Sequence, residues 1–319
     1  MLTQVSTRVA MLEIQRRQDT WQGRCATSLR ALVNDKITCA AVIFLLFVLA
    51  SVLPADLLVD ASLLSDPNTQ NLALRNLPPG FAPGGTFHIL GTDQLGRDEF
   101  SRIVFGARVS LSVGLATVLV SVAVGLVLGL LAGFYRGRVD DLLMRLVDIQ
   151  MGFPSLLLAL AVLYVAGPGF KNLILVLAFT RWTITARVTR AMTLSLREYP
   201  FIEAARAVGT TDIGIMVRHL LPNLLSPILV LGTLEFARAM LSEAALSFLG
   251  VGIQPPQSSW GLMLSQGRPY ITTAWWLVAF PGFAILLTTL SVNLLATWIR
   301  AITDPFQRWR WLDIRPQSR

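Results

Sequence analysis

Long uncharged stretches alternate with short charged segments along most of the chain. Four stretches contain no charged residue at all, and they cover 37–55, 109–134, 149–170 and 269–299. About 20 apolar residues are enough for a helix to cross a bilayer, so each stretch predicts one transmembrane helix. Two further apolar segments, 171–190 and 221–249, are interrupted by charge. The pattern therefore predicts an all-α membrane protein with six transmembrane helices.

The composition supports this class. Of 319 residues, 54% are hydrophobic and 14% are charged, whereas about 25% charged residues are usual in soluble domains. So few charges would not cover the surface of a soluble protein of this size. We expect the chain to lie in a lipid bilayer and not to bind nucleic acid.

The positions of the cationic residues predict the orientation. With the N-terminus inside, 19 of the 27 lysines and arginines fall in cytoplasmic segments, six in outer segments and two within spans. An excess of lysine and arginine marks the cytoplasmic side. The first 36 residues are too long for the charged start of a signal peptide and predict a cytosolic tail. Both termini are therefore expected to be cytoplasmic.

These spans divide the chain into five predicted parts. They are a cytoplasmic tail over 1–36, a first transmembrane helix over 37–56, an extracytoplasmic loop with an interfacial helix over 57–108, a five-helix core over 109–301 and a cytoplasmic tail over 302–319.

The cytoplasmic segment between the fourth and fifth spans predicts a short helix outside the membrane, over 200–208. Pro200 suits the first helical position, and Glu203 complements the positive end of the helix dipole. Gly209 can end this helix and Asp212 can cap the next one. The middle of the helix carries small side chains, at Ala204, Ala205 and Ala207. Such a helix can enter a groove on another protein, or it can be a plain connector.

Charged residues inside the predicted spans need a reason, since one at mid-bilayer costs roughly 2.5–3.5 kcal/mol. Arg181 lies in the fourth span, and Glu235, Arg238 and Glu243 share one arc of the fifth. Arg238 can pair with Glu235, three residues away. Arg181 has two interpretations: a buried ion pair with a glutamate of the fifth span, or a group in a transport pathway that attracts an anionic part of the substrate.

No motif predicts catalysis or a bound cofactor on this chain. A Walker A loop needs Gly-Lys followed by Ser or Thr, but Ile37 follows Lys36 and Asn172 follows Lys171. The two histidines are 131 positions apart, at His88 and His219, which gives little support for metal chemistry. We expect neither a catalytic residue nor a metal site, nor a cofactor held by this chain.

A resemblance adds to this interpretation. The cytoplasmic segment matches the Glu-Ala-Ala…Gly…Ile-x-Leu-Pro signature of ABC importer permeases, through Glu203, Ala204, Ala205, Gly209, Leu221 and Pro222. His219 stands where the family has isoleucine. The resemblance implies a type I ABC importer permease fold, with a coupling helix at 200–216 that docks on an ATPase subunit.

Other motifs are similar to those of dipeptide, oligopeptide and nickel ABC importers. They occupy 91–98, 101–108, 153–155, 243–250 and 254–261. Among the two permeases of such importers, the chain resembles the second. The resemblance implies half of a translocation pathway in a bacterial or archaeal inner membrane. It also implies a paralogous permease, one or two ATPase subunits that bind ATP and Mg²⁺, and an extracytoplasmic solute-binding protein. The substrate would be di- or oligopeptides or related small solutes.

The outer motif has a physical interpretation as well. Gly91 and Gly96 permit turns, and Asp98 can cap an interfacial helix over 99–109. Three arginines are expected at the level of the lipid headgroups: Arg97, Arg102 and Arg108. The segment either seats the second span or contacts a receptor or gate.

A different class of transporter stays open at this point. In a proton-coupled secondary transporter, Glu235 or Glu243 would carry the proton. Inverted repeats and broken spans would favour that class, and the sequence shows none. An intramembrane enzyme is disfavoured by the absence of Gly-x-Ser-x-Gly and His-Glu-x-x-His motifs.

Overall fold

The computed structural model describes residues 35–62, 64–80 and 87–303, and the regular elements in these ranges are helical. The main helices are α3 (Lys36–Val52), α4 (Ala55–Asp60), α5 (Glu99–Tyr135), α6 (Gly137–Met151), α7 (Ser155–Ala166), α8 (Phe170–Leu196), α9 (Pro200–Ala207), α10 (Asp212–Ile215), α11 (Leu221–Phe248), α12 (Trp260–Gly267) and α13 (Trp276–Thr303).

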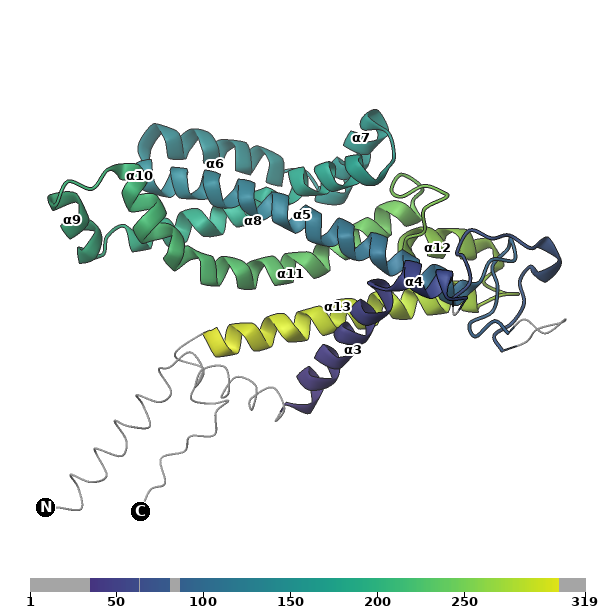
Figure 1. Cartoon of the computed structure of the whole chain (residues 1–319). Helices are drawn as coiled ribbons and strands as arrows, with labels where there is room; N and C mark the ends of the chain where they lie inside the picture. The colour runs from purple at the N-terminus through teal and green to yellow at the C-terminus, as the bar shows by residue number, and fades with distance from the viewer. Residues whose placement is uncertain (1–34, 63, 81–86, 304–319) are drawn as a thin grey trace, which may run out of the picture.

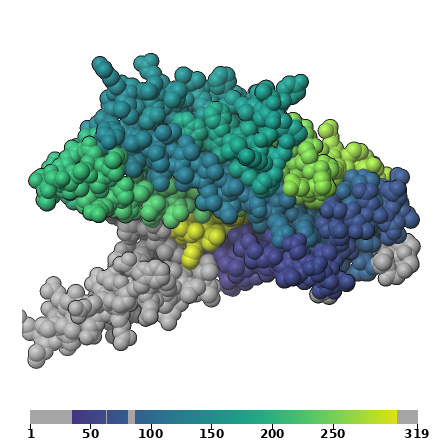
Figure 2. Space-filling model, turned by 45° about the horizontal axis from the view of Figure 1, so that its top comes forward, coloured from purple at the N-terminus to yellow at the C-terminus, as the bar shows by residue number. Residues whose placement is uncertain are grey.

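The long helices α5, α8, α11 and α13 run between two ends of an elongated bundle (Figure 1). Helices α9 and α10 lie at one end, called here the α9 end. Helices α4 and α12 and the loop before α5 lie near the other, the α12 end. Figure 2 shows the α9 end, in green, projecting beyond the body of the bundle.

In the part of the chain that the structure describes, three helices are long and apolar enough to cross a membrane: Glu99–Tyr135, Asp212–Phe248 and Trp276–Ala301. A fourth crossing results if the bent pair α6 and α7 counts as one span. Helix α3 is apolar but has 17 residues. It ends at Val52, before Pro54, and so stops short of the predicted boundary at residue 56.

The predicted span over 149–170 is not one straight helix. Helix α6 ends at Met151, α7 begins at Ser155, and their axes differ by 88°. Pro154 lacks the backbone donor that a continuing helix needs, and it disfavours helical geometry at the residue before it. An uncharged stretch predicts apolar surroundings and does not report such a change of direction.

Helix α5 begins earlier than the predicted second span. The expected interfacial helix and this span form one helix of 37 residues. Asp98 caps it, because its Oδ2 accepts the Ser101 backbone N–H at 2.8 Å. Between residues 99 and 109 no proline interrupts the backbone hydrogen bonds, so the helix continues.

Helices α5 and α8 pack more closely than side chains of ordinary size allow. Gly125, Gly129 and Gly133 repeat every four residues along one face of α5. A Cβ added at Gly129 would lie 2.4 Å from the carbonyl oxygen of Ala186, and one at Gly125 would lie 2.6 Å from the Cβ of Thr185. Small residues at this spacing let two membrane helices approach closely.

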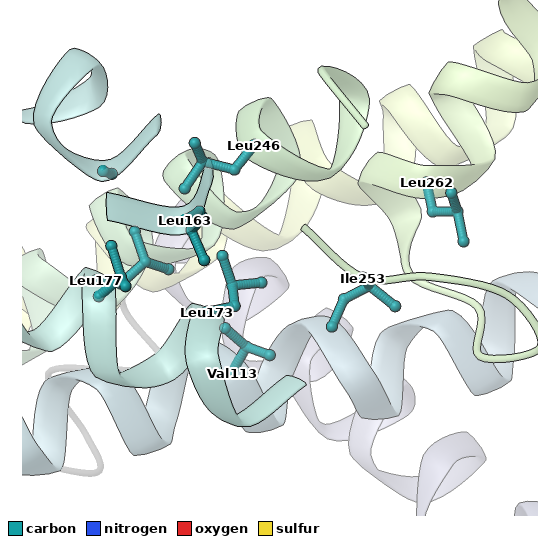
Figure 3. Packing of buried hydrophobic residues seen from close by; sticks show 9 residues of the cluster. Val113, Leu163, Leu173, Leu177, Leu246, Ile253 and Leu262 are labelled. Atoms are coloured by element: carbon teal, nitrogen blue, oxygen red, sulfur yellow. The ribbon is translucent and has the colours of Figure 1, made fainter. Parts of the chain in front are cut away.

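An apolar core near the α12 end joins several helices (Figure 3). Its buried side chains include Val113, Leu163, Leu173, Leu177, Leu246, Ile253 and Leu262. They come from α5, α7, α8, α11 and the segment around α12. A second cluster, at the α9 end, holds α9 and α10 against the bundle and is described with the site.

Candidate functional site at the α9 end and the ion cluster of the bundle

Helix α9 is a short helix with one buried side. Pro200 occupies its first turn, and Glu203 is the acidic residue of that turn. Ile202 is 1% exposed and packs in a cluster that includes Leu130, Phe134 and Leu220. The helix is therefore anchored to the bundle through its apolar side, which fixes which side faces outward.

Gly209 ends α9 in the way its sequence position predicts. Its φ is +82°, a value that costs a residue with a Cβ about 1–2 kcal/mol. The Gly209 N–H donates to the Arg206 carbonyl at 2.9 Å, and the Thr210 N–H donates to the Ala205 carbonyl at 3.0 Å. These two bonds form a Schellman motif, which satisfies the last carbonyls of the helix.

The predicted coupling helix over 200–216 is therefore two helices separated by a turn. Helix α9 ends at Ala207 and α10 begins at Asp212. The cap of α10 is Thr211, whose hydroxyl accepts the Gly214 N–H at 3.2 Å, and not Asp212 as predicted. Asp212 instead occupies the first position of α10, where its charge still complements the helix dipole.

The outward side of this segment is exposed and partly apolar. Glu203, Ala204 and Ala207 are exposed, whereas Ala205 is half-buried against the bundle. The turn after α9 borders a hollow of about 580 Å³, whose lining includes three exposed apolar side chains. These are Val208, Ile213 and Val217. The sequence analysis did not single them out, although apolar residues beside a turn outside the predicted spans were a visible signal.

A π-helical turn joins α10 to α11. It covers Met216–Leu220 and contains His219. Leu221 and Pro222, the last motif residues, open α11. Pro222 has no N–H to donate to the residue four positions earlier, and a π-turn accommodates such a gap.

Three of the four charged residues predicted to lie within spans form a cluster between α8 and α11. Arg181 Nη1 lies 2.8 Å from Glu235 Oε2, so the contact expected between Arg181 and a glutamate of the fifth span is present. Arg238 Nη1 lies 2.8 Å from the other oxygen, Glu235 Oε1. Arg181 Nη2 also donates to Ser242 Oγ at 2.7 Å and to the Arg238 carbonyl at 2.9 Å.

Glu243 does not join this cluster. It is fully buried, and its two oxygens accept hydrogen bonds from Ser110 Oγ at 2.9 Å and Ser247 Oγ at 2.8 Å. It therefore connects α5 to α11. The three charged residues that share one arc of α11 therefore belong to two separate arrangements in the bundle.

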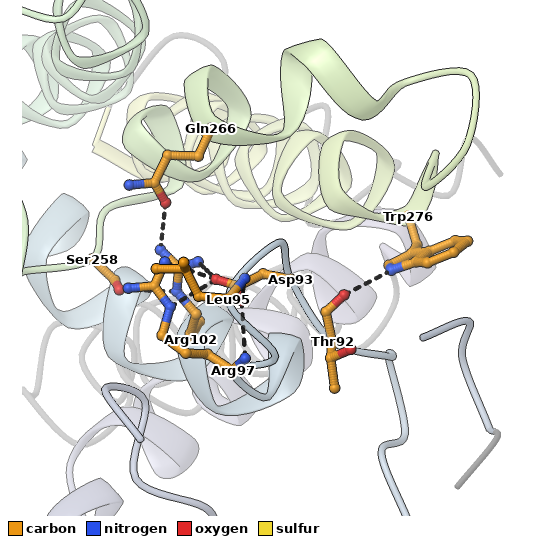
Figure 4. A network of polar contacts seen from close by, with 8 residues as sticks. All are labelled: Thr92, Asp93, Leu95, Arg97, Arg102, Ser258, Gln266 and Trp276. Carbon is orange, nitrogen blue, oxygen red and sulfur yellow. Dashed lines mark hydrogen bonds and ion pairs between the residues drawn. The ribbon is translucent and has the colours of Figure 1, made fainter. Parts of the chain in front are cut away.

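The outer motif is a buried polar network at the α12 end (Figure 4). Asp93 Oδ2 accepts from Arg97 Nε at 2.7 Å and from Arg102 Nη1. Arg102 is 2% exposed, and its Nη2 donates to Gln266 Oε1 at 2.8 Å. The network ties the loop before α5 to α12. Trp276 Nε1 adds a bond to the Thr92 carbonyl at 3.3 Å.

The expectation of three arginines at the headgroups is wrong for Arg97 and Arg102, which are buried in protein. Arg108 is exposed and forms two hydrogen bonds with Asp56, at 3.1 and 2.8 Å. The hydrogen bonds from Arg108 hold the pKa of the Asp56 carboxyl below its usual value. Gly91 and Gly96 have φ values of +81° and +71°, so the predicted turns are present.

Comparison with known proteins gives the family. Residues 125–309 match the family described as "Binding-protein-dependent transport system inner membrane component". The chain belongs to this family. It is accordingly a multi-pass inner-membrane protein and a transport subunit, and membership does not support a proton-coupled transporter.

Individual relatives agree with this assignment. The chain is 40% identical over 279 residues to a putative peptide transport system permease protein of Brucella abortus biovar 1, covering 88% of this chain and 90% of the relative. It is 45% identical over 218 residues to the dipeptide transport system permease protein DppC of Alkalihalophilus pseudofirmus, covering 68% and 72%.

A solved structure shows the same fold. It is a chain of the MetNI methionine ABC transporter in inward-facing conformations, with a TM-score of 0.52 and 20% identity. The match covers 64% of this chain and 97% of the other. The permease architecture expected from the sequence is therefore present in its overall form.

Proposed function

We propose that this chain is the second of two permease subunits of an ABC importer for di- or oligopeptides or related small solutes. Family membership establishes the class of transport system, and the names of both reported permease relatives support the peptide substrate. The single observation that carries the coupling role is the exposed, partly apolar outward side of α9 and α10, anchored by the buried Ile202. An apolar surface that is held rigidly and borders a hollow suits a docking partner.

In this proposal the chain crosses the membrane six times, with both termini in the cytoplasm and a type I importer permease arrangement. The crossings are α3, α5, the bent α6–α7 pair, α8, α11 and α13. In Figure 1, the long helices α5, α8, α11 and α13 run between the α9 end and the α12 end, and α3 leads toward the α12 end. The α9 end then faces the cytoplasm and the α12 end faces outward, which agrees with the distribution of lysine and arginine.

The proposed complex contains a paralogous permease, one or two ATPase subunits and an extracytoplasmic solute-binding protein. The ATPase subunits bind ATP and Mg²⁺ and hydrolyse the nucleotide, while this chain supplies half of the pathway. Glu203, Ala204 and Ala207 contact the ATPase subunit, because they form the exposed side of α9.

Copurification tests the coupling role. The tagged chain is extracted with its complex in mild detergent, and copurified chains are identified by mass spectrometry. Ala204→Trp places a bulky group on the exposed side of α9, where the fold has room for it, and we expect the ATPase yield to fall at least tenfold. Asp66→Trp, on the exposed loop at the opposite end, is the matched control and leaves the yield unchanged.

Two results would contradict the proposal. Full ATPase recovery with Ala204→Trp would move the docking surface away from α9. A wild-type chain that purifies from its native membrane without an ATPase would contradict the importer assignment for this complex.

A further inference from the structure

Arg181 and Arg238 lie at the same depth in the bundle. Gly169, just before α8, donates its N–H to the carbonyl of Gly252, just after α11, at 3.2 Å. Counted from there, Arg181 is eleven residues into α8 and Arg238 is ten residues before the end of α11. At about 1.5 Å per residue, both lie about 15 Å from this end, half of the roughly 30 Å thickness of a bilayer core.

The two arginines differ in exposure and in bonding. The Arg181 side chain is 12% exposed, and its two terminal nitrogens contact Glu235, Ser242 and the Arg238 carbonyl. The Arg238 side chain is 60% exposed. Within the described residues, Glu235 is the one hydrogen-bond partner of the Arg238 guanidinium. Arg238 therefore keeps donors that point away from the cluster.

An exposed guanidinium at this depth indicates what surrounds it. A charged side chain in contact with acyl chains is so costly that intramembrane arginines face the bundle interior or a water-filled cavity. The face of α11 that carries Arg238 is therefore a face of the pathway or of the contact with the second permease. Glu235 is 1% exposed and accepts from both guanidiniums, so the three side chains carry a net charge of +1.

We infer that Arg238 binds the carboxylate of the transported solute as it passes the middle of the pathway, and that Arg181 and Ser242 are positioning residues. This inference rests on the proposed function. A planar guanidinium with free donors suits bidentate recognition of a carboxylate. Glu235 Oε1 accepts from one terminal nitrogen of this guanidinium, Nη1, and the cluster keeps one positive charge in excess. The solute class is therefore one with a free carboxylate, such as the C-terminus of a peptide.

Uptake by the complete importer in proteoliposomes tests the inference. The probes are the tripeptide Ala-Ala-Ala and its C-terminal amide, each at the concentration that half-saturates wild-type uptake, so that recognition by the solute-binding protein is matched. Arg238→Gln is expected to lower uptake of the free acid about tenfold and to leave uptake of the amide within about twofold. Arg238→Lys keeps a positive charge and stays within about threefold of wild type for both probes.

Arg187→Gln is the matched control. It removes an arginine of α8 that pairs with Asp148 on the surface, with side chains 50% and 64% exposed. We expect its ratio of acid to amide uptake to equal that of the wild type. The yield of the purified complex is measured for every variant.

Three results would overturn the inference. Equal losses of acid and amide uptake in Arg238→Gln would make the cluster purely structural. Loss of the paralogous permease from the purified Arg238→Gln complex would assign this guanidinium to a carboxylate of that subunit. Unchanged uptake of the free-acid tripeptide by Arg238→Gln would mean that the carboxylate of the solute does not bind Arg238. The proposed function fails separately, when the wild-type complex with ATP takes up neither probe.

Discussion

Glu235 is the centre of the ion cluster because, among the residues described, it alone contacts the guanidiniums of both Arg181 and Arg238. Its nearly complete burial means that it depends on Arg181 and Arg238 for compensation. The dependence is unequal: either arginine can be lost and Glu235 keeps the other, but loss of Glu235 leaves two cations side by side.

This asymmetry predicts an order of stabilities. Glu235→Leu is expected to lower the free energy of unfolding by about 3–5 kcal/mol, since it leaves charge without a partner inside the bundle. Arg181→Leu is expected to cost less, because Arg238 still pairs with Glu235. Ser242→Ala, which removes one hydrogen bond, is the mild control, at about 1 kcal/mol. Thermal unfolding of the purified complex measures all three, and an Arg181→Leu variant as unstable as Glu235→Leu would contradict this account.

At the residue scale, the sequence predicted what depends on near neighbours. The helix end at Gly209, the cap at Asp98 and the Glu235–Arg238 pair involve residues within a few positions of each other. Arg102 was misplaced because two of its three partners, Ser258 and Gln266, lie 156 and 164 positions away. No local pattern reports such a partner, so a buried arginine and a headgroup arginine look alike in the sequence.

At the scale of elements, the α5–α8 pair is a closely packed and extensive contact. Three glycines of α5 face the backbone and the threonine side chains of α8. With no hydrophobic driving force between helices in lipid, this fit is a main source of their association.

Two glycine substitutions test this contact. Gly129→Ala would place a methyl group 2.4 Å from the Ala186 carbonyl oxygen, so the helices must separate, at a cost of about 1–3 kcal/mol. In Gly232→Ala on α11, the new methyl meets Val118 and Val122 at ordinary distances of 3.6 and 3.8 Å. That variant is expected to gain about 0.5–1 kcal/mol from reduced backbone freedom. The unfolding midpoints of Gly129→Ala and Gly232→Ala are measured by thermal unfolding in detergent. Equal midpoints for the two variants would show that α5 and α8 are not close-packed at Gly129.

The elements also show where a sequence pattern misleads. Uncharged stretches gave the number of apolar segments but not their geometry, so the break at Pro154 and the continuity of α5 from Glu99 were both missed. The proline was visible, yet prolines at 227 and 281 stay inside α11 and α13. Whether a proline bends a helix sharply depends on the packing of its neighbours, which are distant in sequence.

At the scale of the whole molecule, the network around Asp93 joins the outer loop before α5 to α12 and, through Thr92, to α13. Asp93 compensates two buried arginines, whereas Asp56 pairs with one exposed arginine. Exposed ion pairs add little to stability, but a buried pair that loses one member is strongly destabilised.

Asp93→Ala is accordingly expected to destabilise the protein by about 3–5 kcal/mol, while Asp56→Ala leaves the unfolding midpoint unchanged within error. Limited proteolysis of the outer loop gives a second measurement, since the loop before α5 is released from α12 in Asp93→Ala alone. Equal behaviour of the two variants would mean that the buried network does not hold the outer loop.

Helix α5 touches both ends of the molecule. At one end Phe134 receives Arg206 of α9 over its ring at 5.5 Å, and at the other Arg102 enters the Asp93 network. Its 37 residues make a rod of about 55 Å. A tilt of about 10° moves the far end of such a rod by roughly 10 Å relative to the near end. Helix α5 is thus a single rigid link between the two ends, so a displacement of α9 that tilts α5 is transmitted to the opposite face.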